Sequence, residues 1–199
     1  MRKLLLSTAV ILMASTSVFA APVVGEMAPN FKGMDTNGVQ HELSDFLGKT
    51  VVLEWTNHDC PYVKKHYDGG NMQSIQKSAT DDGVVWLSIV SSASGKQGQL
   101  DNATANAVMK DVGSNATARI QDPSGTIGKL YDAKTTPHMF VVDAEGALVY
   151  AGAIDSDSSF KPDGIPTATN YVTDALSSIK AGEPIEVSST QPYGCSVKY

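Results

Sequence analysis

The stretch that decides the fold runs from Val51 to His66 and reads VVLEWTNHDCPYVKKH. It opens with an apolar, β-favouring run, residues 51–55, which contains one acid and predicts a buried strand. The polar residues 56–59 predict a turn, and Cys60 and Pro61 follow it. Proline is favoured at the first position of a helix, so Cys60 is expected at the N-cap, where free N–H groups and the helix dipole favour a thiolate. The stretch therefore predicts a reactive cysteine between a strand and a helix.

A second interpretation of Cys60 stays open at this point, because a buried cysteine often serves only as a small apolar side chain. His58 and His66 lie close to Cys60 in the sequence. Titratable groups beside a nucleophile are typical of tuned sites, although both histidines would also fit ordinary surface positions.

Length and composition indicate a single globular domain. The chain has 199 residues, of which 42% are hydrophobic and 18% charged, and its formal net charge is −6. No basic cluster extends beyond Lys64 and Lys65. Nucleic acids and anionic membranes are therefore not expected as partners.

The first twenty residues read as a secretory signal peptide. Arg2 and Lys3 precede an apolar run over residues 4–14, and Val18-Phe19-Ala20 is a small-x-small cleavage site. The run is too short to span a bilayer, so no membrane association is expected after cleavage. We predict a secreted or periplasmic protein divided into residues 1–20 (signal peptide), 21–182 (one α/β domain) and 183–199 (C-terminal tail).

The chain has two cysteines, Cys60 and Cys195. Export would bring them into an oxidising compartment, where a pair can form a disulfide bond. Two cysteines are too few for a disulfide scaffold, so they indicate either redox chemistry or one structural bond.

Strands and helices are expected to alternate along the domain. An N-terminal β-hairpin is predicted around the turn at Asn37-Gly38, and the helix after Cys60 should break at Gly69-Gly70. The other expected strands cover residues 84–90, 118–121, 139–142 and 147–151, and the other helices cover 101–112, 126–131 and 168–181. Residues 155–166 should form a mobile surface insertion, and residues 185–187 are β-favouring. The pattern predicts an α/β fold with a central mixed β-sheet flanked by helices.

Two motifs together resemble the thioredoxin-fold superfamily. They are Cys60-Pro61 at a helix start and, much later, Thr136-Pro137 opening a strand–turn–strand unit. The resemblance implies that Pro137 is cis and faces Cys60, and that His138 lies near Cys60. It also matches Glu54 to a buried acid that moves protons at the site. A carboxylate in an apolar strand should have a raised pKa, which suits a proton acceptor, but a structural hydrogen-bonding role fits Glu54 equally well.

The chain departs from the thioredoxin motif, because Val63 stands where the second cysteine of Cys-x-x-Cys would be. The segments Ala28–Phe31 and Leu43–Lys49 resemble the opening of peroxiredoxins. Yet Asn57 replaces their threonine or serine, and Pro137 lies where their arginine falls. The chain is most similar to peroxiredoxin-like redoxin proteins, of the alkyl hydroperoxide reductase–thiol-specific antioxidant type, that keep a single Cys-Pro motif.

The leading functional hypothesis is an exported thiol-based oxidoreductase without a cofactor. The Cys60 thiolate would attack a protein disulfide or a small oxidant, and Cys195 or the thiol of an unidentified reductant would resolve the product. Peroxide reduction through Cys60 is an alternative. A second alternative is a copper or zinc site formed by His58, Cys60 and His138, although close ligand spacing is missing. An adaptor with an idle fold is the remaining possibility.

Overall fold

The structure is a computed structural model that describes residues 21–199. The predicted signal peptide, residues 1–20, lies outside the described residues. Within the described part, no helix is long and apolar enough to cross a membrane.

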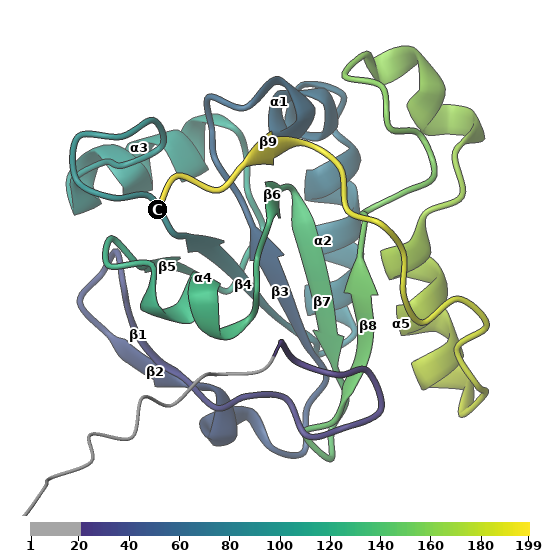
Figure 1. Cartoon of the computed structure of the whole chain (residues 1–199). Coiled ribbons are helices and arrows are strands. Elements are labelled where there is room, and N and C mark those ends of the chain that lie inside the picture. The colour runs from purple at the N-terminus through teal and green to yellow at the C-terminus, as the bar shows by residue number, and fades with distance from the viewer. Residues whose placement is uncertain (1–20) are drawn as a thin grey trace, which may run out of the picture.

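A seven-stranded mixed sheet forms the centre of the molecule, in the order β2-β1-β5-β4-β3-β7-β8 (Figure 1). Strands β3, β4 and β5 are mutually parallel, and the outer strands pair antiparallel. The strand bounds are β1 Lys32–Asp35, β2 Gln40–Glu42, β3 Val51–Trp55, β4 Val85–Val90, β5 Ala118–Gln121, β7 His138–Val142 and β8 Leu148–Gly152. The short strands β6 (Thr135–Thr136) and β9 (Cys195–Ser196) form a separate two-stranded sheet. The mixed α/β sheet predicted from the sequence is confirmed.

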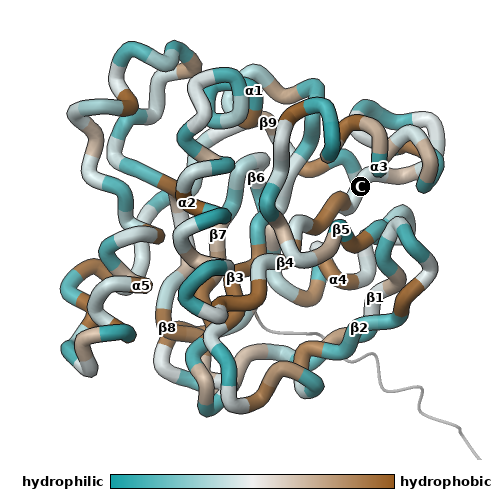
Figure 2. The backbone as a smooth tube through the Cα atoms, turned by 180° about the vertical axis from the view of Figure 1, so that it is seen from behind, coloured by the Kyte–Doolittle hydropathy of each residue, from teal (hydrophilic) through white to brown (hydrophobic). Residues whose placement is uncertain are grey.

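The helices cover both faces of the sheet. One face packs against α2 and α5 through side chains such as Met72 and Val172, and the other packs against α4 through Ile127. The helix bounds are α1 Pro61–Asp68, α2 Asn71–Asp81, α3 Asn102–Asp111, α4 Thr126–Leu130 and α5 Tyr171–Ala181, with 3₁₀ helices at Leu43–Phe46 and Pro162–Thr167. All side chains of β3, β4 and β7 are buried, as expected for interior strands covered on both faces. Figure 2 shows hydrophobic residues gathered along these central strands.

The helix boundaries follow local chemistry. Gly70 has a φ of 71°, in the left-handed region that glycine tolerates, and this separates α1 from α2 as predicted. Asp101 caps α3 by accepting a hydrogen bond from the Thr104 N–H, and Gly182 ends α5 with a φ of 69°.

Two expectations for the C-terminal third need correction. The patch at residues 185–187 forms no strand. The segment 155–166 is not wholly a surface insertion, because Asp155 is only 3% exposed and faces α1 and the tail. The cause is a buried cation, Lys65 of α1, whose charge needs acidic partners.

Candidate active site

Cys60 lies at the N-cap of α1, as predicted, with Pro61 at the first helical position. Its backbone is extended (φ −73°, ψ 124°), and its carbonyl accepts hydrogen bonds from the N–H groups of Val63 and Lys64 at 3.0 and 2.9 Å. The side chain is fully buried. The sulfur is thus held where the helix N-terminus favours negative charge.

The loop before β7 lies against Cys60. The Thr136–Pro137 peptide bond is cis, as the thioredoxin resemblance implies. The carbonyl oxygen of Thr136 lies 3.1 Å from the Cys60 Sγ atom. Strand β7 pairs with β3 so that His138 is opposite Trp55, and this register places the loop at the end of β3 where Cys60 follows.

The C-terminal tail brings Cys195 to Cys60. Strand β9 pairs antiparallel with β6, with Cys195 opposite Thr136, and Figure 1 shows the tail crossing above the ends of the sheet strands. The two Sγ atoms are 2.6 Å apart. This is longer than the roughly 2.05 Å of a disulfide bond, and both cysteines are free thiols in the structure. The two sulfur atoms are therefore placed close enough for a disulfide bond to form after only a small movement.

A buried polar cluster holds the tail in this position. The Tyr193 hydroxyl donates a hydrogen bond to Asp155 and lies 3.2 Å from His66 Nε2. Lys65, next to His66, pairs with Asp157 at 3.0 Å. Sequence reasoning missed this cluster. The one available signal in the sequence was the pair Lys65-His66, about one and a half helical turns after Cys60. Both side chains are buried residues of α1.

The two thiols differ in acidity. Burial raises the pKa of Cys60, but contacts from Cys195 and the Val63 N–H lower it to a net value below that of an ordinary cysteine. The pKa of Cys195 is raised to about 11 by burial and by its hydrogen bond to Cys60. This matches the predicted direction for Cys60. A low-pKa and a high-pKa thiol in contact suit the roles of nucleophile and resolving group.

The histidines do not supply the positive charge that was expected near Cys60. Burial lowers the pKa of His66 to about 3 and that of His138 to about 4, and it also lowers the pKa of His58. All three are therefore neutral near pH 7. The acidity of Cys60 arises instead from the helix end and the neighbouring tail.

Glu54 is fully buried in β3, and no described hydrogen bond joins it to Cys60. Burial raises the pKa of this carboxyl, while four hydrogen-bond donors act in the opposite direction. The donors are Trp86 Nε1 at 2.8 Å, Ser88 Oγ and Gln76 Nε2 at 3.0 Å, and the Tyr67 hydroxyl at 3.1 Å. The proton-transfer role of Glu54 stays a prediction.

His58 and His138 are not assembled with Cys60 into a ligand set. His138 Nδ1 accepts a hydrogen bond from the Lys134 N–H, and its ring packs on Phe140 with centroids 4.4 Å apart. His58 Nε2 lies 3.4 Å from Asp59. Among residues 21–199, no three His, Cys, Asp or Glu side chains are grouped to hold a metal ion. The copper or zinc alternative thus finds no site in the described part of the chain.

Comparisons with known proteins agree with this fold. The family described as AhpC/TSA matches residues 24–151. The thiol-disulfide oxidoreductase ResA of Bacillus subtilis (strain 168) is 31% identical over 125 residues, which cover 63% of this chain and 64% of that protein. The chain therefore aligns with less than two thirds of the length of this curated relative.

Solved structures share the architecture. A conserved protein from Geobacillus kaustophilus superposes with a TM-score of 0.77 at 24% identity, over 92% of this chain and 94% of that one. The exposed lipoprotein thioredoxin of Streptococcus pneumoniae strain TIGR4 superposes with a TM-score of 0.50 at 26% identity, over 70% of this chain and 96% of that one. The resemblance to thioredoxin-fold redoxins is confirmed.

Proposed function

Because the chain belongs to the AhpC/TSA family, we propose that it is an exported thiol-disulfide oxidoreductase whose redox-active pair is Cys60 and Cys195. The observation that carries the proposal is the 2.6 Å contact between the two sulfur atoms. The opposite pKa shifts of the two thiols support the assignment of their roles. ResA, whose name describes the same activity, is a relative over the matched segment.

In the forward reaction the Cys60 thiolate attacks one sulfur of a substrate disulfide. This forms a Cys60–substrate mixed disulfide and releases the other substrate sulfur as a thiolate. Cys195 then loses its proton to the released thiolate or to solvent, and attacks the Cys60 sulfur. The Cys60–Cys195 bond forms, the second substrate thiolate leaves, and two electrons have passed from the protein to the substrate.

Access to Cys60 requires the tail to move, since Cys60 is fully buried beneath it. Strand β9 is held to β6 by a ladder of only two residue pairs, Thr135 with Ser196 and Thr136 with Cys195. Opening must also break the Tyr193–Asp155 hydrogen bond and the backbone hydrogen bonds of Val197 with Lys134 and of Lys198 with Ala93.

Resetting the protein needs an external thiol reductant, and Cys195 is the more accessible target. It is half-buried, whereas Cys60 is fully buried. Attack by the reductant's thiolate on the Cys195 sulfur would expel Cys60, the thiolate with the lower pKa and hence the better leaving group. A second reductant thiol then releases Cys195.

Peroxide reduction has less support from the site. Arg119 is the only arginine after residue 2. It lines a cavity between α1 and α3 and has no described contact with Cys60. Asn57, in the place of the peroxiredoxin threonine, is bonded to the Asp59 N–H and to the Gln97 carbonyl.

The test uses the mature chain and two matched variants, Cys60→Ser and Cys195→Ser. The wild-type protein should reduce a model protein disulfide with dithiothreitol as electron source, and Cys60→Ser should be inactive. Cys195→Ser should accumulate a mixed disulfide at Cys60, detected by mass spectrometry without reductant. Equal activity of Cys60→Ser and wild type would overturn the proposal. Fractionation and N-terminal sequencing of the expressed chain test export, which predicts a mature start at Ala21.

A further inference from the structure

A polar row crosses the sheet face that packs against α2 and α5. The strand register places Glu54 of β3 opposite Ser88 of β4, and Ser88 opposite Arg119 of β5. Side chains in register on neighbouring strands project from the same face. The carboxylate of Glu54 is fully satisfied by four donors. At the other end of the row, two nitrogen atoms of the Arg119 guanidinium have no hydrogen-bond acceptor.

Arg119 is a buried cation that lacks a partner. It is only 4% exposed, and its Nε and Nη2 atoms have no hydrogen-bond acceptor. No acid among the described residues lies within 4.0 Å of its guanidinium. Burial lowers the pKa of Arg119, while the charge of Glu54 in the same row raises it from beyond ion-pair distance. The unpaired Nε and Nη2 donors make this guanidinium suited to bind an anion.

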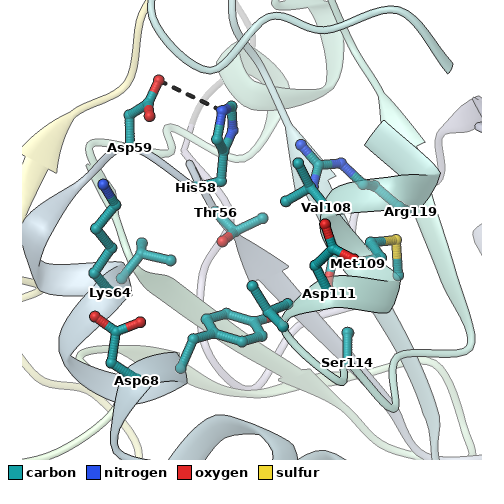
Figure 3. Close-up of a pocket in the computed structure, with 14 residues that line it drawn as sticks. Thr56, His58, Asp59, Lys64, Asp68, Val108, Met109, Asp111, Ser114 and Arg119 are labelled. Atoms are coloured by element: carbon teal, nitrogen blue, oxygen red, sulfur yellow. Dashed lines mark ion pairs between the residues drawn. The ribbon is translucent and has the colours of Figure 1, made fainter. Parts of the chain in front are cut away.

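A cavity of about 220 Å³ lies beside Arg119, between α1 and α3. Figure 3 shows the guanidinium directed into this space, with His58 and Thr56 facing it. The His58 Nδ1 atom is also buried and without a partner. The polar end of the cavity thus offers the planar cation of Arg119, which is complementary to a carboxylate. The neutral His58 ring, whose Nε2 lies 3.4 Å from the Asp59 carboxylate, presents Nδ1 as an acceptor and adds no donor for that group.

The rest of the cavity is mainly apolar. Its walls are formed by Val63 and Tyr67 from α1, and by Val108, Met109 and Val112 from α3 and its C-cap. Apolar walls with a few convergent polar groups are the usual composition of small-molecule sites. A short alkyl chain attached to the anionic group would fill this part.

The mouth of the cavity limits the ligand's charge. Asp59, Asp68 and Asp111 line it and are exposed, and Lys64 is the one basic residue beside them. A second negative charge on the ligand would meet net repulsion there. We propose that this cavity binds a small monocarboxylate with a short alkyl chain, whose carboxylate pairs with Arg119. Cys60 does not line the cavity, so the proposal stands independently of the redox chemistry.

The test is isothermal titration of the mature full-length chain with sodium hexanoate. Binding of hexanoate is expected. Three matched compounds should bind at least about tenfold more weakly: acetate, because it lacks the alkyl chain, hexan-1-ol, because it lacks the charge, and adipate, because it carries a second charge. Arg119→Met should weaken hexanoate binding by at least about tenfold.

A second pair of variants keeps the test decisive if Arg119→Met does not fold. Val108→Phe fills the cavity from α3, while Ala107→Phe places the same side chain at an exposed position of that helix. Only Val108→Phe should abolish binding. Absence of hexanoate binding to the wild type at millimolar concentration, or equal binding by Val108→Phe and Ala107→Phe, would overturn the proposal.

Discussion

Gly194 precedes Cys195, the proposed resolving cysteine, and its replacement by alanine should separate the two thiols. The φ of Gly194 is 135°, a backbone conformation that residues other than glycine rarely adopt. A Cβ atom there would lie 2.1 Å from the carbonyl oxygen of Thr136, inside the 3.0 Å that real Cβ contacts essentially never breach. Because the clash is with backbone, it can be relieved only by moving β9 away from β6 by roughly 1 Å.

The expected magnitude follows from the strain. An unfavourable φ at a non-glycine residue costs roughly 1–3 kcal/mol, and here opening the two-residue ladder relieves it. A loss of about 2 kcal/mol in tail docking corresponds to about a thirtyfold lower effective concentration of Cys195 at Cys60.

The assay is equilibration in glutathione redox buffers, acid quenching, alkylation and mass spectrometry, which gives the equilibrium constant of the Cys60–Cys195 bond. Gly83→Ala is the matched control. Gly83 has a φ of 85°, but a Cβ there meets nothing within 4 Å. The control should lose stability through φ strain alone and keep the redox equilibrium. If Gly194→Ala retains a wild-type equilibrium constant, the docking of the tail on Thr136 does not set the pairing.

Three further predictions concern the anchor, the thiol and a buried histidine. Tyr193→Phe removes the hydroxyl that is hydrogen-bonded to Asp155 and should weaken docking of the tail by about 1–3 kcal/mol. The expected result is faster alkylation of Cys60, and an unchanged alkylation rate would contradict the anchoring role of Tyr193. The pKa of Cys60 should be higher in Cys195→Ala than in Cys195→Ser, because only serine keeps a hydrogen-bond donor to the Cys60 thiolate. The alkylation rate of Cys60 against pH measures this pKa in both variants. Equal pKa values would refute the stabilisation of the thiolate by residue 195. Burial lowers the pKa of His138 to about 4, below the ordinary histidine value of 6.5, so the neutral imidazole is favoured in the folded state. The contribution of His138 to the free energy of unfolding, up to about 3 kcal/mol, should be lost as pH falls from 6.5 towards 4. Urea unfolding at several pH values should show a smaller loss of stability over this range for His138→Gln. An equal pH dependence of the free energy of unfolding in the variant and the wild type would exclude His138 as the cause.

Local signals in the sequence were sufficient to predict the backbone geometry around Cys60. An apolar strand, a polar turn and Cys60-Pro61 fix the N-cap geometry within a dozen residues, so no distant contact is needed to infer it. Likewise, Gly69-Gly70 predicted the break between α1 and α2 from conformational preference alone. The cis bond before Pro137 was predictable only from the resemblance, because most X–Pro bonds are trans.

The tail could not be placed from local signals. Residues 185–187 favour a strand but form none, whereas Cys195 and Ser196 form one because β6 offers them backbone partners. Lys65 and Asp155 each read as surface residues, and they become buried because they neutralise one another across elements far apart in the chain. Such pairings depend on the assembled fold, so a single sequence does not reveal them.

The position of Cys195 has a consequence for how a substrate would be received. In the structure the backbone of β6 next to Cys60 is occupied by β9, so the tail covers both the thiol and a strand edge. The proposed lifting of the tail would expose the Cys60 sulfur and, in the same movement, free the polar backbone groups of Thr135 and Thr136. An extended peptide segment can pair with such an edge by main-chain hydrogen bonds. In the proposed reaction, the returning tail would compete for that edge while Cys195 attacks Cys60. The same strand pairing would then promote both the release of the reduced substrate and the closure of the proposed Cys60–Cys195 bond.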